Sequence, residues 1–137
     1  MAQKASLFEG AIKLRNVFVL VGGYRKLHKS PGSAEFVNAK EVMTWTEANS
    51  PVPVIGMNTF NSEEGAMLSV GVSPYEQGEV AATMAIKLIE GVDIKSLPIQ
   101  TSSQYVVAVR KSALDARNIS IPEMFEAYAR ASNNYFN

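Results

Sequence analysis

The chain has 137 residues, 47% of them hydrophobic, and its 13 basic and 13 acidic residues give a formal net charge of zero. This length and composition fit a single α/β or other globular domain over residues 1–137, and the charge balance argues against nucleic acid or a membrane surface as a partner. The lack of cysteine excludes disulfides, zinc–thiolate sites and cysteine nucleophiles. No apolar run approaches the roughly 20 residues that span a bilayer, so no membrane insertion is expected.

The first half of the chain alternates predicted helices and strands. Apolar residues with a helical period predict a helix over residues 5–14. The run VFVLV at residues 17–21 predicts a strand that is covered on both faces, as in a parallel sheet. Ser33 is the expected N-cap of a helix over residues 33–50. A second buried strand is expected over residues 52–57.

A loop over residues 58–66 and a strand over residues 67–72 come next. Ser73, Pro74 and Glu76 then supply an N-cap hydroxyl, a first-turn proline and a capping-box glutamate, and Gly91 is a natural residue to follow the helix end. This helix therefore begins at the Ser73–Glu76 turn. Its apolar residues form one stripe that we expect to lie against another surface, namely Val80, Ala81, Met84, Ala85, Leu88 and Ile89.

The remaining predicted elements are an exposed strand over residues 104–110, a short helix over residues 112–118 and an amphipathic helix that begins at Pro122. Strands and helices thus alternate along the chain. The sequence predicts an α/β fold in which a mostly parallel sheet is flanked by helices.

Sequence signatures of enzymes and metal sites are missing. His28 is the one histidine, and without cysteine it has no metal-ligand pattern around it. No GxSxG, Walker A or GxGxxG motif is present. Glu63 and Glu64 are adjacent on a predicted loop, which is a poor arrangement for an acid–base pair. We therefore expect a non-enzymatic protein without metal or cofactor. A basic patch is either a solvated loop or a contact for phosphate or an acidic partner, and consists of Arg25, Lys26, His28 and Lys29.

A binding site is expected where the parallel strands end, because ligands of open α/β sheets bind at the carboxyl ends of the strands. These ends carry small residues, an amide, hydroxyls, two tyrosines and a helix N-terminus that can accept an anion. Ser73 and Glu76 could instead serve only as caps, and Glu64 could meet a ligand ammonium or be a solvated acid. The candidate ligand contacts are Tyr24, Asn58, Thr59, Glu64, Ser73 and Tyr75.

Four short motifs in order suggest a known family. They are Pro53-Val54-Ile55-Gly56, the glycine-bounded strand at residues 65–71, Tyr75-Glu76-Gln77-Gly78, and the connector from Gly91 to Pro98. With them, residues 16–128 resemble the C-terminal half of ABC-transporter substrate-binding proteins of the type I periplasmic-binding-protein fold. The resemblance implies a Rossmann-like half of that fold, with the Ser73–Glu76 turn near a cleft between two lobes.

The resemblance also implies a function. It suggests a solute-binding or ligand-sensing domain, periplasmic or otherwise extracytoplasmic, that binds a small polar or aromatic molecule, with an amino acid as one candidate. Its expected partners are an ABC permease or a linked signalling domain, and a second copy in a homodimer that supplies the missing wall of the cleft. The alternative is a structural α/β module that pairs with another chain and has no small-molecule ligand.

Overall fold

The computed structural model describes residues 17–137, so the helix expected over residues 5–14 lies outside the described residues. The chain forms two compact units. Unit 1 comprises the described residues up to Gly71 together with Val107–Asn137, and unit 2 is Val72–Val106. A single domain over residues 1–137 stays a prediction.

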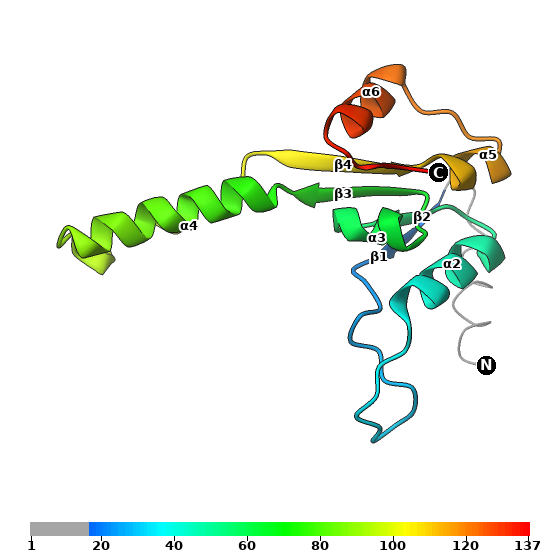
Figure 1. Ribbon diagram of the computed structural model, residues 1–137, viewed down its shortest axis with the longest axis horizontal. Helices are drawn as coiled ribbons and strands as arrows, with labels where there is room; N and C mark the ends of the chain where they lie inside the picture. Colours follow the sequence, from blue (N-terminus) through cyan, green and yellow to red (C-terminus); the bar gives the residue numbers. More distant parts are fainter. Residues whose placement is uncertain (1–16) are drawn as a thin grey trace. The chain divides into compact units, whose positions relative to one another are not determined.

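Within residues 17–137, five strands form one sheet in the order β1-β2-β3-β4-β5 (Figure 1). Their bounds are Val19–Val21, Val54–Gly56, Leu68–Val72, Tyr105–Arg110 and Tyr135–Phe136. β1 and β2, β2 and β3, and β4 and β5 pair in parallel. The expected α/β fold with a mostly parallel sheet is confirmed.

β3 and β4 run in opposite directions. Arg110 N donates to Met67 O in unit 1, and Ser73 N donates to Gln104 O in unit 2. The beginning of β3 therefore neighbours the end of β4, while the end of β3 neighbours the beginning of β4. This is the pattern of an antiparallel pair.

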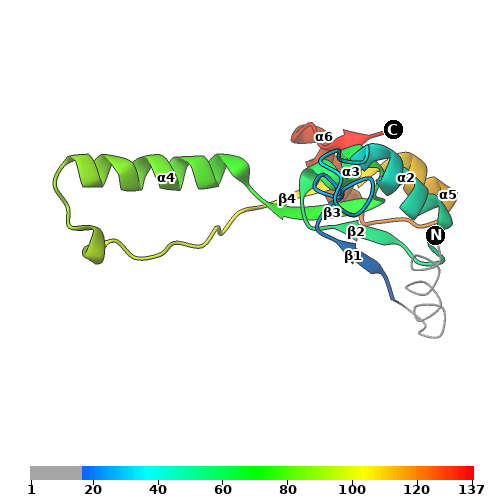
Figure 2. The ribbon, with the colours of Figure 1, turned by 90° about the horizontal axis from the view of Figure 1, so that it is seen from below.

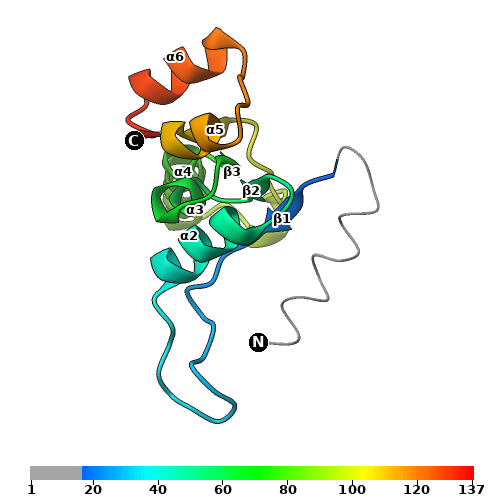
Figure 3. The ribbon, with the colours of Figure 1, turned by 90° about the vertical axis from the view of Figure 1, so that its right-hand side faces the viewer.

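Four helices belong to unit 1 among its described residues: α2 (Ala39–Asn49), α3 (Thr59–Glu64), α5 (Lys111–Ala116) and α6 (Glu123–Ala131). α2 and α3 lie side by side (Figures 1 and 3). α3 also contacts β2, and both α5 and α6 contact β5. α3, α5 and α6 thus pack against strands of the sheet.

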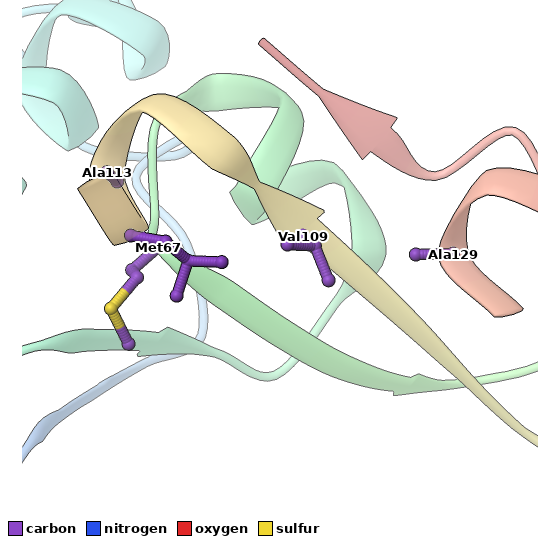
Figure 4. Close-up of a cluster of buried hydrophobic side chains, with 5 residues drawn as sticks. Met67, Val109, Ala113 and Ala129 are labelled. Atoms are coloured by element: carbon purple, nitrogen blue, oxygen red, sulfur yellow. The ribbon is translucent and has the colours of Figure 1, made fainter. Parts of the chain in front are cut away.

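Two hydrophobic clusters form the core of unit 1. One joins β1, β2 and α2 through Val21, Met43, Val54 and Ala66. The other joins the start of β3 to the last quarter of the chain through Met67, Val109, Ala113, Leu114 and Ala129 (Figure 4). Burial of these side chains supplies the main driving force for folding of unit 1.

Two expected features of unit 1 were wrong, and one strand was missed. The N-cap of α2 is Asn38 rather than Ser33, because Asn38 Oδ1 accepts from Lys40 N and Glu41 N. The preceding residues pair back on the chain instead, with Val37 N donating to Leu27 O. The expected loop over residues 58–66 contains helix α3, and strand β5 was not predicted at all.

Unit 2 contains α4 (Pro74–Ile89) and a 3-10 turn at Ile94–Ser96, and its chain returns alongside α4 (Figure 2). Ser73 caps α4 as predicted, since its Oγ accepts from Glu76 N. Glu76 does not complete the capping box, because its carboxylate binds Ser103 and Gln104. No residue of α4 is buried. Within the described residues, the expected burial of its apolar stripe is therefore wrong.

Candidate functional site

The loops that follow β1 and β2 meet at one edge of the sheet. The two strands are parallel neighbours, so their carboxyl ends lie together. Met57 N donates to Val21 O at 3.0 Å, and Asn58 Nδ2 donates to Gly22 O at 3.0 Å. These bonds hold the glycine segment after β1 against the start of α3.

The structure assigns the six predicted contact residues to different units. Tyr24, Asn58, Thr59 and Glu64 belong to unit 1, whereas Ser73 and Tyr75 belong to unit 2. Each group is therefore described within its own unit.

In unit 1, three of the predicted residues belong to α3 or its cap, and the fourth is Tyr24. Tyr24 packs against the core cluster of β1, β2 and α2, and its hydroxyl lies 3.4 Å from Thr46 Oγ1. Asn58 is the N-cap of α3, Thr59 is its first residue and Glu64 its last. Asn58, Thr59 and Glu64 thus lie on α3 or its cap, whereas Tyr24 contacts α2.

Glu64 has an ion-pair partner that sequence reasoning missed. Its Oε1 lies 2.5 Å from Arg25 Nε. The Arg25 guanidinium carbon lies 3.8 Å from the centre of the Phe60 ring. Glu64 is only 8% exposed, and its second oxygen, Oε2, has no hydrogen-bond partner among the described residues. The sequence places Arg25 in a basic loop patch. Because 39 residues separate it from Glu64, the local sequence carries no signal of this ion pair.

Asn61 is a second polar residue that the sequence did not single out. It is fully buried, and its Oδ1 accepts from Asn58 N at 3.0 Å. Its Nδ2 has no hydrogen-bond partner among residues 17–137. Gly23 has φ +145°, and a Cβ at this position would lie 3.4 Å from Asn61 Nδ2. A glycine here lets the loop after β1 approach α3 closely.

In unit 2, Ser73 and Tyr75 have different environments. Ser73 is 5% exposed and its hydroxyl is used by the cap, whereas Tyr75 is 88% exposed. Hydrogen bonds from the Ser103 hydroxyl and from the main-chain N–H groups of Gln104 and Ser103 lower the pKa of Glu76. The start of α4 is therefore fixed, and Tyr75 presents an aromatic ring from it to solvent.

A cavity of about 360 Å³ lies at the opposite ends of the strands and is lined partly by Gly65, Arg110 and Arg117. Arg110 donates to the carbonyl oxygens of Ser62 and Glu63 at the end of α3, and Arg117 donates to Ser50 O after α2. Desolvation lowers the pKa of Arg110. Both arginines thus donate hydrogen bonds to carbonyl groups at the C-terminal ends of helices. The cavity is separate from the edge of the sheet at which ligand binding is predicted.

No group of three His, Asp or Glu side chains among residues 17–137 is placed to hold a metal ion. In the same residues, no helix combines the length and the apolar character needed to cross a bilayer. The ring of His28 instead packs on Phe36, with ring centres 4.7 Å apart.

Known proteins that are similar to this chain include a protein family and a solved structure. The family model described as ABC transporter substrate binding protein matches residues 33–132. A crystal structure of a conserved domain protein from Vibrio cholerae O1 biovar El Tor is similar, with 29% sequence identity and a TM-score of 0.50. The match covers 63% of this chain and 28% of that chain. No curated protein matches the sequence.

Proposed function

The chain belongs to the family of ABC transporter substrate-binding proteins, and on this premise we propose that it binds a small solute for an ABC-type transport or signalling system. The observation that carries the proposal is the surface around α3. There, two loops from neighbouring parallel strands meet beside Asn61 Nδ2 and Glu64 Oε2, two buried polar atoms that have no hydrogen-bond partner among residues 17–137. Buried polar atoms of this kind are normally satisfied, so a solute or ordered water is expected to complete them.

The proposed solute is a small polar or aromatic molecule, with an amino acid as one candidate. Its contacts in unit 1 are Tyr24, Asn58, Thr59 and Glu64, and those in unit 2 are Ser73 and Tyr75. The exposed ring of Tyr75 is suited to stacking on an apolar or aromatic group. Binding without catalysis is the role proposed for these residues, in a periplasmic or other extracytoplasmic compartment.

We further propose that the binding cleft is of the type I kind and is completed by a second copy of the chain in a homodimer. The chain spans 28% of the length of the similar Vibrio cholerae protein. α4 has no buried residue, and exposed apolar side chains on it include Ile86 at 55% and Ile89 at 86%. Apolar surface of this extent is characteristic of association sites.

The same exposed helix favours a second candidate function. A module that pairs with another chain through α4 and binds no solute would also need this apolar stripe. The two functions differ in whether a small molecule accompanies the protein.

Native mass spectrometry of the purified chain tests both functions and the dimer. A dimer that carries extra mass, released on denaturation, supports solute binding across two chains. A monomeric mass at micromolar concentration would refute the homodimer. If neither native spectra nor thermal-shift screening with amino acids, sugars, amines and nucleosides reveals a bound molecule, solute binding is wrong and the pairing module is favoured.

A further inference from the structure

The side chain of Arg25 contacts Phe60 and Glu64 of α3 within unit 1. Its guanidinium faces the ring of Phe60 at 3.8 Å and the carboxylate of Glu64 at 2.5 Å. An aromatic face and a carboxylate are the two groups with which proteins bind organic cations. Arg25 therefore occupies the position that a ligand cation would take.

The carboxylate of Glu64 is only partly used by this pairing. Arginine commonly binds a carboxylate through two parallel hydrogen bonds, but here only Nε and Oε1 are paired. Oε2 is buried and has no partner among the described residues. Glu64 thus retains an acceptor for a second N–H donor.

The backbone of Glu64 is held at the end of α3, whereas the Arg25 side chain is half exposed. Glu64 ends α3, its main-chain O accepts from Thr44 Oγ1 at 3.2 Å, and Gly65 N caps the helix by donating to Asn61 O. The Arg25 side chain is 54% exposed, and it follows Gly22 and Gly23, which are both exposed. A solute cation that replaces the guanidinium keeps the buried Glu64 carboxylate paired, so Arg25 can leave without stranding that charge.

We propose that Phe60 and Glu64 form a subsite for an ammonium or guanidinium group of the solute, which Arg25 occupies in the free protein and vacates when the solute binds. This inference rests on the proposed solute-binding function and adds to it a class of ligand, the organic amines and guanidines. It also assigns to Arg25 the role of an internal competitor.

Removing Arg25 should improve the binding of a cation, because the competing guanidinium is then gone. Agmatine and putrescine are suitable probes for isothermal titration calorimetry, since they carry cationic groups without a carboxylate. We expect Arg25→Met to bind them more tightly than the wild type, by up to about fivefold, which matches the small stability of an exposed ion pair. Adding Glu64→Gln to Arg25→Met should then weaken binding by about tenfold or more.

Lys29→Met is the matched control. Lys29 lies on the same loop and forms an exposed ion pair with Glu35 at 2.7 Å, so its removal takes the same charge from the loop. We expect it to leave the affinities unchanged. If Arg25→Met does not fold, the side-chain Nε–Hε resonance of Arg25 in the wild type provides a second readout, because agmatine should shift it toward that of a solvated arginine.

Failure of the cation subsite and failure of the solute-binding function give different results. Equal affinity of wild type and Arg25→Met for both probes, or no binding of either probe, would overturn the cation subsite. A neutral or anionic solute found by native mass spectrometry would also overturn it while leaving the solute-binding function intact. If no solute of any class binds, the proposed function itself fails.

Discussion

Glu47 and Arg117 form an ion pair with side chains only 8% and 16% exposed, although 70 residues separate them in the sequence. Glu47 Oε1 binds Arg117, while Oε2 accepts from Val54 N and Met67 N. One carboxylate therefore connects α2 to the start of β2, to the residue before β3 and to the end of α5. Every oxygen of the buried carboxylate has a partner, as the cost of burying a charge requires.

Removing one partner of this pair should be strongly destabilising. Arg117→Met leaves the Glu47 carboxylate buried without its cation, and we expect the free energy of unfolding to fall by about 3–5 kcal/mol. Urea unfolding followed by circular dichroism measures the change. Lys111→Met, which removes the exposed pair with Asp115, should lower the free energy of unfolding far less, because exposed ion pairs contribute little to stability. A similar decrease in the free energy of unfolding in the two variants would contradict the central role of Glu47.

Gly56 in β2 should not tolerate a side chain. A Cβ there would lie 2.4 Å from Asn61 Cβ and 2.6 Å from Ser69 Oγ, which bonds the buried Ser62. We expect Gly56→Ala to lower stability by about 1–3 kcal/mol through overpacking. Gly78→Ala is the control of opposite sign: it lies within α4 with nothing near the added Cβ, so it should stabilise the helix by about 0.5–1 kcal/mol. Thermal unfolding of both variants gives the comparison.

The start of α4 should depend on pH through Glu76. The Ser103 hydroxyl and the N–H groups of Gln104 and Ser103 favour the carboxylate, so the pKa of Glu76 lies below its ordinary value of 4.5. A lowered pKa means that the stabilisation is complete above pH 4.5 and is lost as the pH falls through the lower pKa.

Amide NMR shifts of Ser103 and Gln104, followed from neutral pH to about pH 3, measure this transition. We expect a midpoint below 4.5 in the wild type. Glu76→Gln should abolish it, and Glu79→Gln on the same helix should leave it in place. A midpoint above the ordinary value would disprove the hydrogen-bonded carboxylate.

Tyr75 should affect binding and not folding. Its side chain is 88% exposed, so Tyr75→Ala removes little buried surface and should change the melting temperature by no more than about a degree. If Tyr75 stacks on the solute, affinity should fall by about tenfold. Ile99→Ala, at 97% exposure in the segment after α4, is the matched control for general loss of apolar surface. Equal affinity of wild type and Tyr75→Ala would remove Tyr75 from the site.

Much of the fold could be predicted because apolar strands have a strong local signal, although β1 is not covered on both faces as expected, since Leu20 is 56% exposed. The continuous apolar runs that precede Gly22, Met57 and Ser73 correspond to β1, β2 and β3. α3 has no comparable signal, since TFNSEE lacks a helical apolar period. Its C-terminal end depends on Arg110, which donates to carbonyl groups 47 and 48 residues earlier in the chain. Contacts of this range cannot be derived from spacing.

The start of α2 shows a different limit. Ser33 and Asn38 are both good N-cap residues, and local preference alone does not choose between them. Pairing of residues 27–37, which includes an antiparallel bridge between His28 and Phe36, decides for Asn38. In the candidate site, local sequence likewise could not identify the partner of a charged residue. Glu64 was predicted as a contact, but its ion pair with Arg25 depends on the fold and could not be read from the sequence.

Unit 1 is made from two stretches of chain that unit 2 separates, and this order has a consequence for biosynthesis. The ribosome delivers Met67 and then all of unit 2 before the residues that cover Met67, namely Val109, Ala113, Leu114 and Ala129. Because domains fold as units during translation, unit 1 cannot close its core until this last segment has left the exit tunnel. The nascent chain therefore passes through an interval in which the apolar residues of β3 and α4 are exposed together, and during that interval it is a natural client for a holding chaperone.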